Sequence, residues 1–329
     1  MSGTSIAPTG ALLIVMNAGS GHSDAASTRA IIEEILTRAG REYRFVMVED
    51  PARLADIARR TVEEATAGVG VVVVAGGDGT INTVASAVLG SGCPLGVLPQ
   101  GTFNYFARAH GIPEDAAEAT RALLSARVQP VQVGLVNNRL FLVNASLGLY
   151  PEMLEDREAF KQRFGRSRFV AICSGMATAL KPKTQMRITL QRQGLRSQVR
   201  SLTLFVGNNA LQVEREGIPF AEELLDGHLV AIALRPIGRL ALLWLLLRGA
   251  LGRLGDAENL TSFGFARMTV NLSSLYKRRR VKVATDGEVI WLDFPLDFRV
   301  SPQPLYLLKP DPASDSVSAS QAPTGSLPP

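Results

Sequence analysis

The chain has 329 residues, of which 46% are hydrophobic and 20% are charged, so it is neither disordered nor fibrous. At roughly 100–200 residues per domain, this length favours two domains. Its 35 Lys and Arg against 30 Asp and Glu leave a net charge of +5, which suits an anionic partner such as a nucleotide, a membrane surface or a nucleic acid without choosing among them.

Strands and helices alternate over about the first 130 residues. Continuous apolar runs predict strands, and apolar residues at helical spacing predict helices between them. The expected strands are Ala11–Met16, Phe45–Val48 and Gly70–Val74, and the expected helices are Thr28–Ala39, a stretch through Leu54 and Val62, and Ile81–Leu89. This alternation is typical of βαβ units and predicts an open α/β domain.

Past Pro130 the pattern changes to short alternating runs separated by turn residues, which predicts a mainly antiparallel β-sandwich. Two helical stretches interrupt it, at Phe169–Leu180 and Leu240–Leu251. Residues 311–329 are rich in Ser, Pro and Ala, and we expect a disordered tail there. The expected strands are Val131–Val136, Arg139–Gly148, Met186–Gln191, Ser201–Asn209, His228–Arg235, Arg267–Leu272, Arg280–Thr285 and Glu288–Phe294.

Cysteine usage and the absence of targeting signals indicate a cytoplasmic protein. Cys93 and Cys173 are too few for a disulfide framework and lack the spacing of a zinc site. The N-terminus has no basic region followed by a long apolar run. The most apolar stretch, Leu240–Leu247, falls short of the roughly 18 residues that span a bilayer.

A glycine-rich loop, GGDGT (Gly76–Thr80), lies between an expected strand and an expected helix. Backbone without side chains lets an anion approach, and the N–H groups at the start of a helix point at it, so the loop predicts phosphate binding. A tight βα turn that needs small residues explains the same glycines. Neither a Walker-type loop nor a dinucleotide fingerprint is present.

Four blocks, in order, resemble the diacylglycerol kinase catalytic-domain family, which includes bacterial lipid kinases and sphingosine and ceramide kinases. They cover nearly the whole chain from Leu12 to Pro310. The blocks are Asn17–Gly21 (NAGSG), Ala75–Leu89 (AGGDGTINTVASAVL), Pro94–Pro113 (PLGVLPQGTFNYFARAHGIP) and Val283–Ile290 (VATDGEVI).

The resemblance implies an N-terminal Rossmann-like nucleotide-binding domain, of the kind found in NAD kinases and phosphofructokinases, and a C-terminal β-sandwich domain. The expected boundaries are 10–134 for the first domain and 135–310 for the lipid-substrate domain, whose last segment can return to the first. The implied activity is an ATP-dependent lipid kinase of phospholipid metabolism, with its active site in the cleft between the domains. The acceptor would be a diacylglycerol-like or sphingoid-like alcohol.

Carried over residue by residue, the family's nucleotide site falls on the glycine-rich segments. The implied donor is ATP with Mg²⁺, for which the Asp78 carboxylate is a suitable oxygen ligand. The expected nucleotide-binding residues are Asn17, Gly19, Ser20, Gly21, Gly76, Gly77, Asp78, Gly79, Thr80, Ile81, Asn82, Gly101 and Thr102.

Asp286 matches the family's general base, which would accept the proton of the lipid hydroxyl. The dipeptide Asp286-Gly287 between two apolar runs is equally the signature of a type I′ hairpin turn. The two interpretations are compatible, because a rigid turn positions a base well.

The resemblance also implies a structural Mg²⁺ site. The Asp226 carboxylate would bind the ion together with the main-chain carbonyls of Glu223 and His228. An ordinary histidine at a strand edge is the alternative for His228.

Several positions depart from the family pattern. Tyr105 stands where most members have Asp, Thr83 where Glu is common, and Val48 where a nucleotide-contacting Thr is usual. The acceptor side of the site is expected at Asn104, Tyr105 and Glu288.

A lipid kinase must reach a membrane, and the segment Arg157–Arg168 carries basic residues interleaved with phenylalanines. We therefore expect peripheral contact with the inner membrane surface; a solvated charged helix is the alternative. The basic run Lys277–Arg280 has no aromatic platform or recognition motif next to it, so we expect an exposed loop there rather than a nucleic-acid site.

Two other functions compete with the lipid kinase. An NAD kinase would also contain GGDG, but it does not account for PQGTFN or DGE. A catalytically weak regulatory protein that binds lipid or nucleotide would account for the departures from the family pattern at Tyr105 and Thr83. The sequence is compatible with a homodimer.

Overall fold

The computed structural model describes residues 10–17, 25–152, 154–155, 186–192, 195–209, 227–238, 260–272 and 280–310. These residues form two compact units. The first unit comprises the described residues up to Val131 together with those from Gln303 onward, and the second unit runs from Gln132 to Pro302. The chain therefore leaves the first unit, builds the second and returns.

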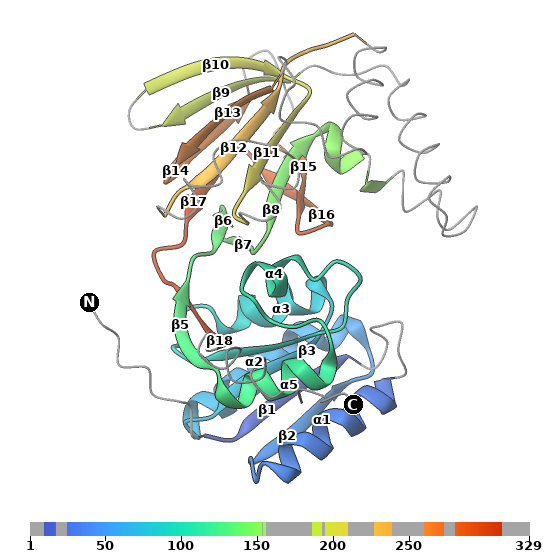
Figure 1. Cartoon of the computed structure of the whole chain (residues 1–329). Helices are drawn as coiled ribbons and strands as arrows, with labels where there is room; N and C mark the ends of the chain where they lie inside the picture. Colours follow the sequence, from blue (N-terminus) through green and yellow to red (C-terminus); the bar gives the residue numbers. More distant parts are fainter. Residues whose placement is uncertain are drawn as a thin grey trace, which may run out of the picture. The chain divides into compact units, whose positions relative to one another are not determined.

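The first unit contains one mixed six-stranded sheet in the order β2-β1-β3-β4-β18-β5 (Figure 1). Strands β2, β1, β3, β4 and β18 are parallel, and β5 pairs antiparallel with β18. The strands are β1 Leu12–Asn17, β2 Tyr43–Val48, β3 Val71–Gly76, β4 Leu95–Pro99, β5 Arg127–Val131 and β18 Leu305–Lys309.

Helices connect these strands and cover the sheet. Helix α1 contacts α5, and α2 contacts α3. Because crossovers between parallel strands are right-handed, the strand order places α1 on the opposite face from α2 and α3. The helices are α1 Ala25–Arg38, the short 3₁₀ turn Pro51–Arg53, α2 Leu54–Ala67, α3 Asp78–Val88, α4 Tyr105–Ala109 and α5 Ala116–Ser125.

Burial explains why the apolar runs became parallel strands. Every residue of β3 is buried, as expected for a strand covered on both faces. Helix α5 begins where the Asp115 side chain accepts hydrogen bonds from the N–H groups of Ala117 and Glu118, both at 2.9 Å. Because β1, β3 and β4 are parallel neighbours, their carboxyl ends meet at one edge of the sheet. In the sequence, a glycine-rich segment follows each of these strands.

The second unit contains two six-stranded sheets, in the orders β10-β9-β14-β17-β6-β7 and β13-β12-β11-β8-β15-β16. All of their pairings are antiparallel. The strands are β6 Gly134–Val136, β7 Arg139–Phe141, β8 Asn144–Gly148, β9 Met186–Arg192, β10 Leu195–Ser201, β11 Thr203–Gly207, β12 Leu229–Leu234, β13 Leu260–Phe265, β14 Arg267–Leu272, β15 Arg280–Thr285, β16 Glu288–Asp293 and β17 Leu296–Val300.

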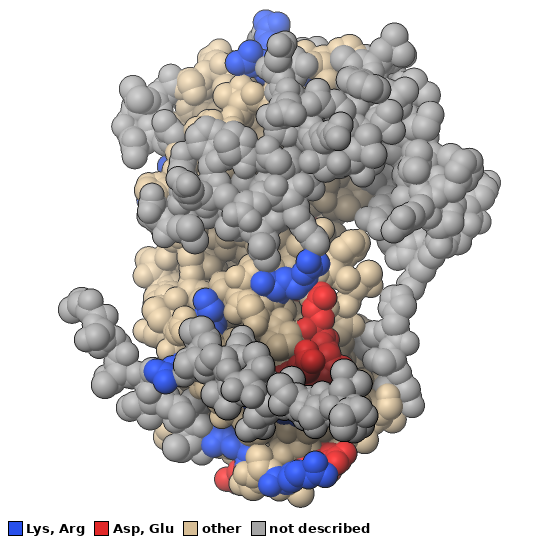
Figure 2. All heavy atoms as spheres, viewed as in Figure 1, with Lys and Arg blue, Asp and Glu red and all other residues tan. Residues whose placement is uncertain are grey.

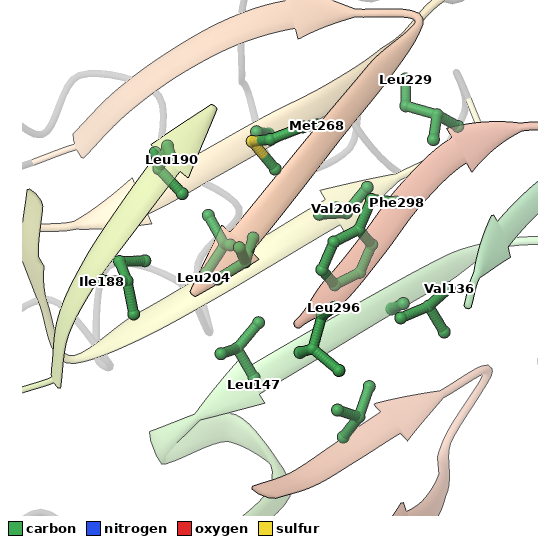
Figure 3. Packing of buried hydrophobic residues seen from close by; sticks show 14 of the residues in the cluster. Val136, Leu147, Ile188, Leu190, Leu204, Val206, Leu229, Met268, Leu296 and Phe298 are labelled. Atoms are coloured by element: carbon green, nitrogen blue, oxygen red, sulfur yellow. The ribbon is translucent and has the colours of Figure 1, made fainter. Parts of the chain in front are cut away.

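The two sheets of the second unit share one hydrophobic core (Figure 3). Val136, Phe298 and Met268 come from the first of these sheets, and Leu147 and Val206 come from the second. All of them are fully buried. The prediction of a β-rich second half is confirmed, as is that of an α/β first half.

Three differences from the sequence predictions bear on the site. The expected single strand Arg139–Gly148 is wrong: it is two strands, β7 and β8, in different sheets. Helix α3 begins at Asp78 rather than at Ile81, so the GGDGT segment enters the helix. Strands β4, β5, β10, β13, β17 and β18 were not predicted, because each is a short run whose apolar residues are few or lie next to Gly, Pro or charged residues.

Charged side chains of both signs are scattered over the face shown in Figure 2, in small groups rather than in one broad patch of the described surface. No helix among the described residues combines the length and apolar character needed to cross a bilayer. The basic segment Arg157–Arg168, the helical stretches Phe169–Leu180 and Leu240–Leu251, and the tail from 311 lie outside the described residues.

Candidate active site

The glycine-rich loop forms the start of α3. Gly77 is the residue before the helix, with φ −83° and ψ 177°, and it contributes no side-chain hydrogen bond to the first turn. The N–H groups of a helical first turn have no partner within the helix and carry the positive end of its dipole. Without a capping side chain in the way, this turn can bind an anion such as phosphate.

Close backbone packing explains Gly77, and open space distinguishes Gly79. A Cβ atom at Gly77 would lie 3.3 Å from the Cα of Gly101, so the loop after β3 touches the loop after β4. A Cβ atom at Gly79, by contrast, would meet nothing within 4 Å. The space beside Gly79 is therefore open, which a bound phosphate requires.

Asp78 is the only acidic residue in the first turn of α3, and it lies beside the residues that would hold phosphate. A carboxylate and a triphosphate repel each other unless a cation lies between them. The Asp78 carboxylate together with phosphate oxygens would thus suit a hard divalent cation. The described residues contain no cluster of three or more His, Cys, Asp or Glu side chains.

The loop after β4 is closed by the side chain of Asn104. Its Oδ1 accepts a hydrogen bond from the Gly101 N–H at 2.8 Å, and its Nδ2 donates to the Gly101 carbonyl at 2.9 Å. Asn104 is buried and adopts a left-handed conformation with φ 48°, which Asn tolerates better than most residues. Its amide group thus holds the loop, with Thr102 and Phe103 exposed at the tip.

In the second unit, Asp286 and Gly287 form the hairpin turn between β15 and β16. Their φ angles are 49° and 90°, as a type I′ turn requires. The expected hairpin is therefore present. The Asp286 carboxylate also accepts three backbone hydrogen bonds, from Leu142 at 2.7 Å, Val143 at 2.8 Å and Asn144 at 2.9 Å.

The residues that bind Asp286 are the crossover between the two sheets. Leu142 and Val143 join β7 to β8, and both are buried. Their N–H groups donate to Asp286, while the Leu142 carbonyl accepts from Asn208 Nδ2 at 2.9 Å and the Val143 carbonyl accepts from the Asn208 N–H at 2.8 Å. Asp286 and Asn208 therefore form hydrogen bonds with all four backbone polar groups of Leu142 and Val143, where the chain passes from one sheet to the other.

Gln132 extends this network. Its Nε2 donates to Asn208 Oδ1 at 2.9 Å and to the His228 carbonyl at 3.0 Å. The His228 main chain, rather than its imidazole, is thus the part of this residue held in the network. We call Gln132, Asn208 and Asp286, together with Leu142–Asn144, the crossover network.

Two buried titratable groups have shifted pKa values. Burial lowers the pKa of His110 from 6.5 to about 4, with a smaller contribution from the positive charge of Lys309. Its ring meets the edge of Phe106 at a centroid distance of 4.7 Å. Burial also raises the pKa of the Cys93 thiol, which opposes thiolate formation and makes this cysteine a structural rather than a reactive one.

A pocket of about 590 Å³ adjoins the loop after β4. Gln100, Gly101 and Thr102 form one wall, and the starts of α1 and α5 form the others. Glu114 and Asp115 add carboxylates to it, although Asp115 also caps α5. No motif in the sequence singled out these two residues.

The structure brings together the expected nucleotide residues of the first unit that it describes. Gly76 ends β3, Gly77 precedes α3, and Asp78–Asn82 form the start of α3. Gly101 and Thr102 follow β4, and Asn17 ends β1, which is next to β3 in the sheet. Val48 is fully buried at the end of β2. Asp286, Glu288 and His228 belong to the second unit, and Glu288 is exposed. Gly19, Ser20, Gly21, Glu223 and Asp226 lie outside the described residues.

Sequence reasoning missed Asn208, Gln132 and Phe103 as parts of the site. Gln132 lies in an ordinary alternating run, and only Asn208-Asn209 carried a signal, since two polar residues follow an apolar strand there. The partners of these side chains are distant along the chain, so no local pattern could connect them.

Comparison with known proteins shows what the first part of the chain is similar to. Residues 11–136 match the model described as "Diacylglycerol kinase catalytic domain". The expected resemblance to the diacylglycerol kinase catalytic-domain family is confirmed. The matched range covers the glycine-rich loop, the loop after β4 and the start of the second unit.

Curated relatives of this family have matching names. The chain is 50% identical over 94 residues to "Probable lipid kinase YegS-like" of Pseudomonas aeruginosa (28% of this chain, 31% of that relative). It is 33% identical over 141 residues to a protein of the same name from Klebsiella pneumoniae (42% and 46%). It is 42% identical over 88 residues to "Diacylglycerol kinase" of Bacillus subtilis (26% and 29%). The chain thus spans less than half the length of these relatives.

The fold extends further than the sequence similarity. A crystal structure of a diacylglycerol kinase from Bacillus anthracis superposes with a TM-score of 0.66 at 18% identity, covering 93% of this chain and 98% of that one. At this identity the likeness establishes the fold alone.

Proposed function

We propose that the chain is an ATP-dependent lipid kinase that transfers the γ-phosphoryl group to the hydroxyl of a lipid alcohol at a membrane surface. One observation carries the proposal: the start of α3, with Gly77 before it, Asp78 within it and open space beside Gly79, is suited to a phosphate group and a divalent cation. The family match to the same segment supports it.

In this proposal the first unit binds the donor. The N–H groups at the start of α3 hold the phosphates, and the exposed Thr102 hydroxyl can donate to them. Asp78 would hold Mg²⁺, which would supply charge neutralisation to the triphosphate when bound. Asn104 acts on the donor side by fixing the loop that carries Thr102.

Asp286 accepts the proton of the acceptor. The lipid oxygen bonds to the γ-phosphorus, the bond to the bridging oxygen of ADP breaks, and the hydroxyl proton passes to Asp286. The three N–H donors favour an ionised carboxylate and fix its position, but they also make it a weak base. A weak base suffices, because a loose transition state leaves the nucleophile little deprotonated until late.

The test is the transfer of labelled γ-phosphate from ATP into lipids in detergent micelles by the native chain, Asp286→Asn and Asp293→Asn. Asp293 lies on the same hairpin and is exposed in an ion pair with Arg280, which makes it the matched control. We expect Asp286→Asn to lower turnover by about 100-fold or more, and Asp293→Asn to keep it. ATP binding should survive in both.

Unchanged turnover in Asp286→Asn would remove this residue from the mechanism. Label that enters NAD instead of lipid would replace the proposal with an NAD kinase. Since Asn would direct an N–H₂ group at backbone N–H donors, thermal unfolding of each variant is needed to separate lost catalysis from lost structure.

A further inference from the structure

Trp291 is an exposed tryptophan on the hairpin of β15 and β16. It is 54% exposed, and among the described residues it is the only large exposed hydrophobic residue of the second unit. A single exposed apolar residue is common on protein surfaces, but tryptophan side chains are on average highly buried. The surroundings of this ring therefore decide whether it has a function.

The ring lies on the outward face at the end of a sheet. Strand β16 is the last strand of its sheet, and β15 is the only described strand that pairs with it (Figure 1). Its residues Ile290 and Leu292 pack against the hydrophobic core. Because successive side chains of a strand point to opposite faces, Trp291 points away from that core. Its exposed ring is therefore accessible to a partner from outside the sheet.

Two ion pairs lie beside the indole ring on this face. The register places Lys282 opposite Trp291, and the Lys282 ammonium lies 5.4 Å from the ring centroid and 2.6 Å from a Glu155 carboxylate oxygen. In the next pair on this face, Arg280 Nε lies 3.5 Å from Asp293 Oδ1, and both side chains are mostly exposed. We call Trp291 and these two ion pairs the hairpin face.

The charges of the hairpin face restrict its partner. Each ion pair has one positive and one negative group, so the face has little net charge and does not attract a polyanion such as a nucleic acid. It offers a cation to a phosphate and a carboxylate to an ammonium within one layer. A bilayer of zwitterionic phospholipids presents both groups at its surface, and tryptophan rings are enriched at this headgroup level. The face is thus complementary to such a surface in charge and in polarity.

Asp286, the proposed base, lies on the same hairpin. Trp291 follows it by five positions, which corresponds to at most about 17 Å of extended strand. The proposed function requires this carboxylate to meet the hydroxyl of a lipid. A contact between Trp291 and a bilayer would hold the hairpin turn within that distance of the headgroups.

We propose that the hairpin face binds the headgroup layer of a zwitterionic phospholipid bilayer, with the indole of Trp291 inserted among the headgroups. The proposal rests on the proposed lipid kinase function and adds the surface through which the molecule reaches its substrate. Backbone pairing of a second copy along the edge of β16 that no described strand occupies is the competing use of this strand, and the test includes it.

The test uses the fluorescence of Trp291 in the full chain. The sequence contains two tryptophans, so Trp244→Phe leaves Trp291 as the single emitter. Vesicles of phosphatidylcholine, with and without phosphatidylglycerol, and vesicles of brominated phosphatidylcholine are added to this variant. Flotation measures binding of the native chain, Trp291→Ala and Trp291→Phe to the same vesicles. The control is Tyr306→Ala, which changes an exposed aromatic residue of the first unit.

We expect vesicles to shift the emission of Trp291 to shorter wavelength and brominated lipid to quench it, because the ring enters a less polar layer. Trp291→Ala should weaken binding to phosphatidylcholine vesicles about tenfold, since the exposed ring surface is no longer available for burial. Trp291→Phe should lose less, and Tyr306→Ala should bind as the native chain does. The factor should be similar with phosphatidylglycerol present, because the face is nearly neutral.

Kinase rates separate a membrane contact from a substrate contact. Trp291→Ala should lower kcat/KM for a long-chain diacylglycerol in vesicles about tenfold, in proportion to the lost binding. It should leave kcat/KM for a monomeric short-chain diacylglycerol unchanged. Its thermal unfolding should match that of the native chain, because the ring is not part of the core.

Other results would overturn the proposal. Unchanged emission of Trp291, or equal vesicle binding of the native chain and Trp291→Ala, would contradict contact with a bilayer. An effect seen only with phosphatidylglycerol would contradict a zwitterionic partner. A slower rate with the monomeric lipid would make Trp291 a substrate contact, and a dimer that dissociates in Trp291→Ala, observed by sedimentation velocity, would assign the face to a second copy. If the native chain phosphorylates no lipid, the proposed function fails, and the vesicle measurements decide the proposal by themselves.

Discussion

At the scale of single residues, the carboxylate of Asp78 has the clearest chemical consequence. It lies in the first turn of α3, where the helix dipole and free N–H groups favour an anion, and it would lie next to the phosphates. It therefore helps phosphate binding only through a cation, and hinders it otherwise. This dependence distinguishes a metal-bridged site from a simple phosphate loop.

The effect of Asp78→Asn on ATP affinity should change sign when Mg²⁺ is added. Without metal, the variant should bind ATP more tightly than the native chain, because a repulsion worth about 1 kcal/mol is removed. With excess Mg²⁺ it should bind more weakly, since a metal ligand is lost. Calorimetric titration of ATP with and without EDTA measures both. Equal weakening in the two conditions would show that Asp78 serves folding rather than metal binding.

His110 makes stability depend on pH. Its pKa is lowered from 6.5 to about 4 by burial, so the folded state binds fewer protons than the unfolded state between those values. The stability is complete above pH 6.5 and is lost as the pH falls toward 4, by roughly 3 kcal/mol.

Urea unfolding between pH 4 and pH 7.5 tests this, with His110→Gln as the comparison. The variant has no imidazole to protonate, so its free energy of unfolding should fall less steeply on acidification. Parallel curves for the two proteins would show that His110 is not the titrating group.

At the scale of elements, the crossover between β7 and β8 shows why the site could not be read fully from the sequence. The run Arg139–Gly148 alternates like one strand, but Asp286 and Asn208 bind Leu142 and Val143 and let the chain change sheets there. The local sequence predicts the apolar faces of the strands and the hairpin at Asp286-Gly287. It cannot predict which distant polar side chains will bind the backbone of Leu142 and Val143, where the strand pairing is interrupted.

Asn208→Ala should lower the free energy of unfolding by about 2–4 kcal/mol, because it leaves the Leu142 carbonyl without the Asn208 side-chain donor and removes one of the two acceptors of Gln132 Nε2. Gln132→Ala should cost less. The double variant should be less destabilised than the sum of the single ones, since both remove the same bond. Denaturant titrations of the four proteins measure the coupling; strict additivity would contradict a shared network.

At the scale of the whole molecule, the chain returns to its first unit at the end. Strand β18 lies between β4 and β5, and Leu305, Leu307 and Leu308 are buried in it. The sequence predicted the α/β and β-rich halves from their periodicity, but Pro and Gln around this short strand obscured it. The proposed ATP-binding residues of the first unit therefore depend on a segment some 200 residues away from β4 along the chain.

Truncation tests this dependence. A chain ending at Pro302 should lose ATP binding, because removing three buried leucines costs about 5–8 kcal/mol, comparable with the total stability of a domain. A chain ending at Pro310 keeps β18 and should bind ATP as the full chain does. Equal ATP affinity of the two truncated chains would contradict a structural role for β18.

Phosphorylation of a lipid alcohol by this molecule is tested by incubating the full chain with Mg·ATP and a mixed lipid extract, followed by mass spectrometry of the lipids. We expect at least one lipid alcohol to gain a single phosphoryl group while ADP forms in equal amount. ADP formation without any phosphorylated lipid, or no turnover from protein shown to bind ATP, would contradict it.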